Sequence, residues 1–153
     1  MKIIRNWKKG FTLIELLIVI AIIGVLSTLL MANFIGVRQR ARDSQRKSDL
    51  RQIQAALEIY RSDVGSYPGT LKNCGNSLGN ATNSCNTIYM QKIPSDPSGS
   101  GYNSGNYFYQ TPDNATYTLG ACLENSGDSQ GVPDNPGGSG TCSSKKYYVL
   151  NSP

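Results

Sequence analysis

A single carboxylate lies in the longest apolar run of the chain. Residues 11–37, FTLIELLIVIAIIGVLSTLLMANFIGV, are 27 residues in which Glu15 is the only charged side chain. An ionised carboxylate surrounded by hydrocarbon is costly, so such a group is usually paired, protonated or part of a functional site. The alternative is that Glu15, near one end of the run, reaches the lipid headgroups. The sequence therefore predicts either a partner for Glu15 or a headgroup contact.

A group of bases follows this apolar run. Its members are Arg38, Arg40, Arg42, Arg46, Lys47 and Arg51. Three of them recur at four-residue spacing, which places them on one face of a helix. Such a face can contact DNA phosphates. We favour membrane-surface anchors or contacts between subunits instead, so nucleic acid is not expected as a partner.

Four cysteines lie in the polar half of the chain. They are Cys74, Cys85, Cys122 and Cys142. An even number behind an apolar segment predicts disulfides in an oxidising compartment, with free buried thiols as the alternative. Among three pairings we choose the nearest neighbours, Cys74 with Cys85 and Cys122 with Cys142, although the sequence leaves the other two open.

One short stretch fits a catalytic pattern, and we interpret the match as chance. The stretch GNSLG at 75–79 fits the G-x-S-x-G pattern of hydrolases, but the chain has no histidine to act as the usual base. Zinc is not favoured either, because there is neither histidine nor a C-x-x-C pair. We predict that the protein is not an enzyme and has no catalytic residues.

One long helix is expected to carry the N-terminal half. No proline occurs between residues 11 and 67, and the 27-residue apolar run is long enough to cross a bilayer. Farther along, apolar residues recur every three or four positions and form one stripe. Gly65 and Pro68 should end the helix near residues 63–65. The stripe is Leu50, Ile53, Leu57, Tyr60 and Val64; Arg46, Asp49, Arg51 and Glu58 are expected on a solvated face.

The remaining residues predict a small β-rich head. Strand candidates are YFYQ at 107–110, TYTLGAC at 116–122 and KKYYVL at 145–150, and residues 127–140 resemble a surface loop. A chain of 153 residues is expected to form one module. The expected fold class is α+β, with a long N-terminal α-helix packed on a small antiparallel sheet that carries disulfide-bonded loops.

The stretch KKGFTLIELLIVIAIIGVL, residues 8–26, closely resembles the N-terminal signature of type IV pilins and type II secretion pseudopilins. The shared features are a basic leader, then Gly, Phe, Thr, Leu, one residue and Glu, followed by an apolar helix. The resemblance implies a cleaved leader at 1–10, a transmembrane and assembly helix at 11–37, an amphipathic half at 38–64 and a globular head at 65–153.

The resemblance also implies roles for three residues. A prepilin peptidase would cut between Gly10 and Phe11 and methylate the new amino terminus. Glu15 would help to recruit the subunit into a filament, by pairing with the Phe11 amine of a neighbouring copy. A charge that only the correct neighbour satisfies penalises wrong registers. The subunit would therefore wait as a single-pass membrane protein and later join a helical filament through an assembly platform.

Two positions depart from the family pattern. Ala32 stands where the family commonly has proline, which argues against a proline-assisted break in the helix, although Gly24 and Gly36 could still loosen it. Ser98 follows Asp96 and Pro97 where secretion pseudopilins usually have an aromatic residue. We therefore rank an extracellular type IV pilus first and a secretion pseudopilus second, with a DNA-uptake pilin or a membrane-anchored binding module as further alternatives.

Calcium is the one metal that the resemblance brings in. Secretion pseudopilins bind it in an acidic C-terminal loop, and ENSGDSQGVPDN at 124–135 offers Glu124, Asp128 and Asp134 as hard oxygen ligands. Their spacing matches no EF-hand. A plain solvated loop is the alternative that we favour, so no cofactor is expected and calcium stays open.

Overall fold

The structure is a computed structural model that describes residues 10–80, 85–99, 105–137, 142 and 144–153, apart from the side chains at positions 32 and 33. Most of the predicted leader, the last three residues of the predicted loop at 127–140 and the side chain of Ala32 therefore lie outside the described residues. The chain divides into two compact units, Met1–Val37 and Arg38–Pro153. Helix α1 (Leu13–Val64) contributes to both.

The described part of the first unit is the apolar start of α1. Leu13–Met31 has a mean hydropathy of 2.8 and is long and apolar enough to cross a membrane. Its side chains are exposed in the single chain; Ile14 and Leu17, for example, are 67% and 62% exposed. A helix that is apolar all round needs a lipid or protein environment. This segment fits a membrane anchor.

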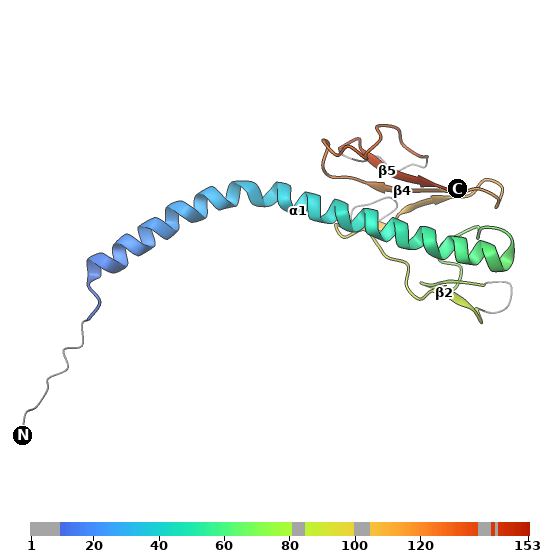
Figure 1. The fold of residues 1–153 in the computed structure, drawn as a ribbon, viewed down its shortest axis with the longest axis horizontal. Coiled ribbons are helices and arrows are strands. Elements are labelled where there is room, and N and C mark those ends of the chain that lie inside the picture. Colours follow the sequence, from blue (N-terminus) through green and yellow to red (C-terminus); the bar gives the residue numbers. More distant parts are fainter. Residues whose placement is uncertain (1–9, 81–84, 100–104, 138–141, 143) are drawn as a thin grey trace, which may run out of the picture. The chain divides into compact units, whose positions relative to one another are not determined.

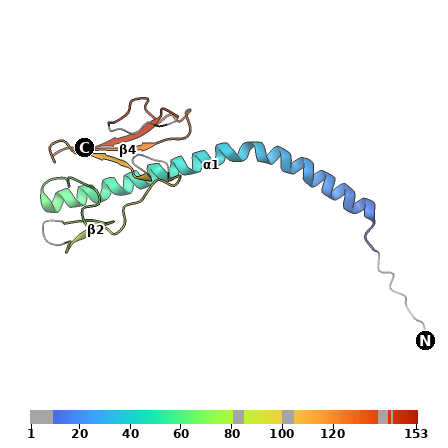
Figure 2. The same ribbon diagram turned by 180° about the vertical axis from the view of Figure 1, so that it is seen from behind.

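In the second unit, the remainder of α1 supplies the core. Leu50, Ile53 and Leu57 are fully buried, Tyr60 is buried, and Val64 packs against the same cluster. This confirms the predicted stripe. In both views of the ribbon, this part of α1 lies between the sheet that contains β4 and β5 and the pair that contains β2 (Figures 1 and 2). Gly65, with φ of 85°, follows the helix, and its N–H donates to the Arg61 carbonyl at 2.8 Å.

The head contains two antiparallel sheets. In the three-stranded sheet, β4 (Thr118–Cys122) lies between β3 (Phe108–Gln110) and β5 (Tyr147–Asn151). Gly120 pairs with Phe108 on one side and with Val149 on the other. All three predicted strands are thus confirmed. The pair β1 (Leu78–Gly79) and β2 (Ile88–Met90) was not predicted, because two and three residues are too few to show a pattern.

Two disulfides fasten the loops of the head. Cys74 bonds to Cys85 and Cys122 to Cys142, which is the nearest-neighbour pairing, and the structure leaves no described cysteine free. The second bond joins the end of β4 to the segment before β5 and so closes the loop that contains residues 127–137. The α+β fold with disulfide-bonded loops agrees with the predicted fold class.

Candidate functional site

The first candidate site is the start of α1. The Thr12 N–H and hydroxyl donate to Glu15 Oε2 at 2.9 and 2.8 Å, and the Glu15 N–H donates to the Thr12 hydroxyl at 3.3 Å. This reciprocal arrangement is a capping box, which satisfies donors that a helix start leaves unpaired. Glu15 therefore has a partner within its own chain.

The capping box leaves Glu15 able to bind a further group. An ionised carboxylate has about four acceptor positions on two oxygens, and Thr12 uses two of them, both on Oε2. Gly10 and Phe11 precede the helix, and both are exposed. The peptide bond between Gly10 and Phe11 is therefore accessible to a peptidase. After cleavage there, the Glu15 carboxylate would lie four residues from the amino terminus at Phe11. Cleavage, methylation and pairing between copies stay predictions.

The second candidate site is buried in the head, and we call it the Arg46 cluster: Arg46, Asp43, Asp96 and Ser98. Arg46 is only 1% exposed. Its Nε and Nη2 donate to the two oxygens of Asp96 at 2.7 and 2.8 Å, and its Nη1 donates to Asp43 at 2.7 Å. This is a bidentate, charge-assisted pair with a second carboxylate on the same guanidinium. It anchors the segment before β3 to α1.

The cluster corrects the prediction of a solvated face. Arg46 and Asp49 are buried, so Arg46 is neither a membrane anchor nor a subunit contact. The Tyr107 hydroxyl donates to Asp49 at 2.6 Å. Burial, and then this hydrogen bond, raise the pKa of Tyr107. Glu58 is half-buried and accepts from the Tyr67 and Tyr117 hydroxyls. The expectation failed because these polar groups find partners far away in sequence; Arg51 alone of the four is exposed.

Hydrogen bonds also set the ionisation of Asp96. Burial by itself would raise the pKa of this carboxyl, but the hydrogen bonds from Arg46 and Ser98 outweigh it and hold the pKa below its ordinary value. Hydrogen bonds to Asp96 and Asp43 raise the pKa of Arg46 despite the opposing effect of burial. Arg46 and Asp96 therefore form an ionised pair at neutral pH.

Two further bases of α1 hold the loop after β4. Arg42 Nε donates to Glu124 at 2.7 Å, and Lys47 Nζ donates to Asp128 at 2.6 Å. Asp43 accepts the N–H groups of Glu124 and Asn125, both at 2.9 Å. The Arg42 hydrogen bond lowers the pKa of Glu124, and the Lys47 hydrogen bond lowers that of Asp128. Arg42 and Lys47 therefore pair within the head, contrary to the prediction that they are membrane anchors or subunit contacts.

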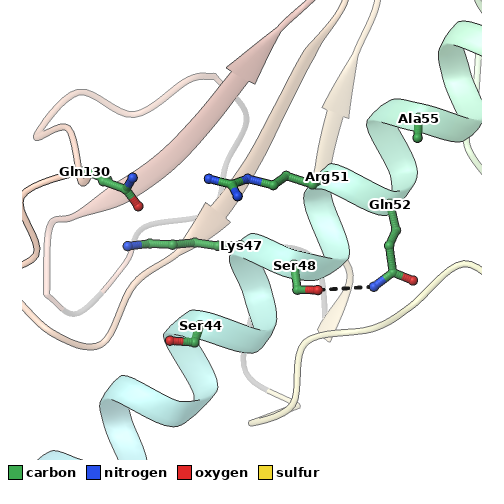
Figure 3. Close-up of a pocket in the computed structure, with 7 residues that line it drawn as sticks. All are labelled: Ser44, Lys47, Ser48, Arg51, Gln52, Ala55 and Gln130. Carbon is green, nitrogen blue, oxygen red and sulfur yellow. Dashed lines mark hydrogen bonds between the residues drawn. The ribbon is translucent and has the colours of Figure 1, made fainter.

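Three bases of the group stay on the surface. Arg38, Arg40 and Arg51 are exposed and stay candidates for anchoring or subunit contacts. Arg51 lies with Lys47 and Gln130 along an open groove of about 550 Å³ (Figure 3). Figure 3 shows both basic side chains extending from α1 toward the loop that carries Gln130. All the residues that line the groove except Ala55 have polar or charged side chains.

The three proposed calcium ligands do not gather in the described residues. Bases of α1 occupy the oxygens of Glu124 and Asp128, and Asp134 is exposed. The described parts of the chain contain no group of three Asp, Glu, Cys or His side chains that could hold a metal ion. This donor set does not fit the calcium site that the resemblance implied.

Several of these residues were not predicted from the sequence. The Thr12-x-x-Glu15 spacing is a known capping signal and could have indicated the capping box. The pairing of Asp43 and Asp96 with Arg46 was not predicted either. Asp43 lies three residues before Arg46, a spacing that helical ion pairs use, so part of the cluster was readable. Nothing local indicates Asp96.

Two family models match the chain. The prokaryotic N-terminal methylation motif matches residues 8–31, and the model of type II secretion system protein G matches residues 33–141. No solved structure gives a significant match.

Curated relatives carry the same name as the second model. A type II secretion system core protein G of Klebsiella pneumoniae is 35% identical over 101 residues, which are 62% of this chain and 72% of the relative. Its counterpart in Pseudomonas aeruginosa is 33% identical over 106 residues, covering 64% and 73%. The Vibrio cholerae protein is 29% identical over 132 residues, covering 80% and 87%. With a family model that matches most of its length, this chain belongs to the type II secretion system protein G family.

Proposed function

We propose that this chain is a structural, non-enzymatic subunit that assembles into the filament of a type II secretion system. The observation that carries the proposal is the extent of the family match. It includes residues 33–141, hence most of the head, and not only the N-terminal motif that pilins share. Relatives named core protein G of such systems support the same assignment.

This proposal reverses the ranking that the sequence alone suggested. Ser98, in place of an aromatic residue, favoured an extracellular type IV pilus. In the structure, the Ser98 hydroxyl accepts from Arg46 at 2.9 Å, and its N–H donates to Asp96 at 2.9 Å. Ser98 is therefore part of the hydrogen-bond network of the Arg46 cluster. Its presence in place of an aromatic residue no longer favours a pilus subunit.

The proposed mechanism follows from the exposed apolar helix. Before assembly, Leu13–Met31 would hold the chain in the membrane as a single span. After a prepilin peptidase has removed residues 1–10, the helix would exchange lipid for the helices of neighbouring copies in a secretion assembly platform. Glu15 keeps acceptor positions free for the Phe11 amine of a neighbour, which would select the correct register.

Deletion of the gene in its own host tests whether the filament serves protein export or is a surface pilus. We expect loss of exoprotein export into the medium with surface pili unchanged, and restoration of export by the intact gene. Loss of surface pili or of twitching with normal export would instead assign the chain to a type IV pilus.

A further inference from the structure

The loop after β4 is the place where carboxylates of the head could meet a cation, and bases of α1 contact them there. Glu124 Oε1 lies 2.7 Å from Arg42 Nε and 2.9 Å from Arg46 Nη2. Both oxygens of Asp128 accept from Lys47 Nζ, at 2.8 and 2.6 Å. The side chains of Glu124 and Asp128 are only 23% and 15% exposed. The Lys47–Asp128 pair is thus largely shielded from water, whereas Arg42, at 35% exposed, is only partly shielded.

Other oxygens of the same loop have donors as well. The Gly131 carbonyl accepts from Lys146 Nζ at 3.3 Å, and the Leu123 carbonyl accepts from the Ser144 hydroxyl. Asp128 Oδ1 also accepts the Gln130 N–H at 2.9 Å. Calcium requires about six to eight oxygen ligands. An ion at this loop would have to displace an ammonium or a guanidinium group and rebuild the turn.

The charges around the loop already balance. Four bases face four acids in these contacts, so the groups that hold the loop carry no net negative charge; Asp134, the third candidate ligand, is exposed and lies outside them. The bases are Arg42, Arg46, Lys47 and Lys146, and the acids are Asp43, Asp96, Glu124 and Asp128.

Helix α1 can hold the loop after β4 in place, which is what a bound metal ion would otherwise do. Arg42 and Lys47 are five residues apart on α1, and their carboxylate partners are four apart on the loop. Asp43, between them, accepts two backbone N–H groups of the loop. The same stretch of helix therefore binds the loop through both side chains and backbone. Figure 3 shows Lys47 extending from α1 toward this loop.

We propose that Arg42 and Lys47 fix the loop at residues 124–131 in place of a calcium ion, and that the head is independent of calcium. This differs from the calcium binding that the resemblance to secretion pseudopilins implied. The proposal does not rest on the task of the filament, because both tests below use the isolated full chain.

The first test is thermal unfolding of the full chain in detergent, after dialysis against EGTA. A calcium site with a dissociation constant of about 1 mM, the weak end for extracellular modules, would raise the melting temperature by a few degrees at about 10 mM calcium. We expect a shift below about 1 °C, as for magnesium under the same conditions. A rise of several degrees that magnesium does not reproduce would overturn the proposal.

The second test asks what holds the loop. Lys47→Met removes one base of the network, and Arg51→Met is the matched control, because Arg51 is an exposed base one turn farther along α1. We expect amide hydrogen exchange at residues 124–131 to become about three- to fivefold faster in the Lys47 variant alone. Lys47→Arg, which keeps the charge, should restore slow exchange. Equal exchange in the Lys47→Met variant and the unchanged chain would contradict the proposal.

Discussion

The start of α1 and the Arg46 cluster each provide a charged side chain with hydrogen-bond partners, but the partners lie at very different distances in the sequence. Glu15 accepts hydrogen bonds from Thr12, three residues away, and stays exposed. Arg46 is buried and is paired with Asp96, 50 residues away. The local arrangement leaves acceptor positions that another copy can use, whereas the long-range one is complete within the head. The charge of Arg46 therefore serves folding, and a role of the Glu15 charge in assembly stays a prediction.

The largest effect should come from breaking the buried pair. Arg46→Met leaves the carboxylates of Asp43 and Asp96 buried without their cation, so we expect a loss of about 3–5 kcal/mol in the free energy of unfolding. Arg51→Met, the exposed control, should change it by less than about 0.5 kcal/mol. Denaturant unfolding of the full chain in detergent measures both. If both variants lose similarly little free energy of unfolding, the Arg46 cluster does not contribute to the stability of the head.

The next effect concerns the disulfide that closes the loop after β4. Replacement of Cys122 and Cys142 by alanine opens a link between residues 20 apart, and we expect a loss of about 3 kcal/mol. The matched pair Cys74 and Cys85, with a separation of 11, should cost slightly less. The same unfolding measurement gives both values. A larger loss for the shorter link would show that local packing, not loop length, sets the contribution.

Acid should weaken the head through Asp96. The pKa of Asp96 in the folded chain lies below its ordinary value. The ionised carboxylate therefore stabilises the fold above the unfolded pKa of about 4, and this stabilisation is lost as the pH falls through the folded pKa. We expect the melting temperature to fall below about pH 4, and to fall less in an Asp96→Asn variant that starts from a lower value. Identical pH profiles for the two chains would exclude Asp96 as a source of the acid sensitivity.

The smallest effect on the free chain is expected at the helix start, where charge and capping can be separated. Glu15→Gln keeps a side chain that can cap the helix but removes the charge, so membrane insertion should persist while incorporation into filaments falls. Thr12→Ala keeps the charge but removes the cap, and it should cost about 1 kcal/mol of helix stability without blocking incorporation. Normal filament yield from the Glu15→Gln variant would remove the charge from the assembly mechanism.

Much of the fold was readable from the sequence because its signals are local. The buried stripe from Leu50 onward follows the helical period, and Gly65 marks the end of α1. The three strands of the larger sheet showed as short β-rich runs. The strands β1 and β2 did not, because their few residues lie among turn formers.

The ion pairs between α1 and distant segments could not be predicted from the sequence, for a physical reason. A base on a helix looks the same in sequence whether water or a distant carboxylate solvates it. Arg46 and Arg51 differ only in what the folded chain brings to them: Asp96 reaches Arg46, while Arg51 stays exposed. By contrast, the capping box at Thr12 and Glu15 was local, and its spacing could have been used.

Mass analysis of filaments isolated from the native host would show whether the chain is a filament subunit. We expect such filaments to contain a chain that begins at an N-methylated Phe11, with residues 1–10 removed. A chain that keeps its first ten residues and stays in the membrane as a monomer would contradict this expectation, and would point to a membrane-anchored binding module instead.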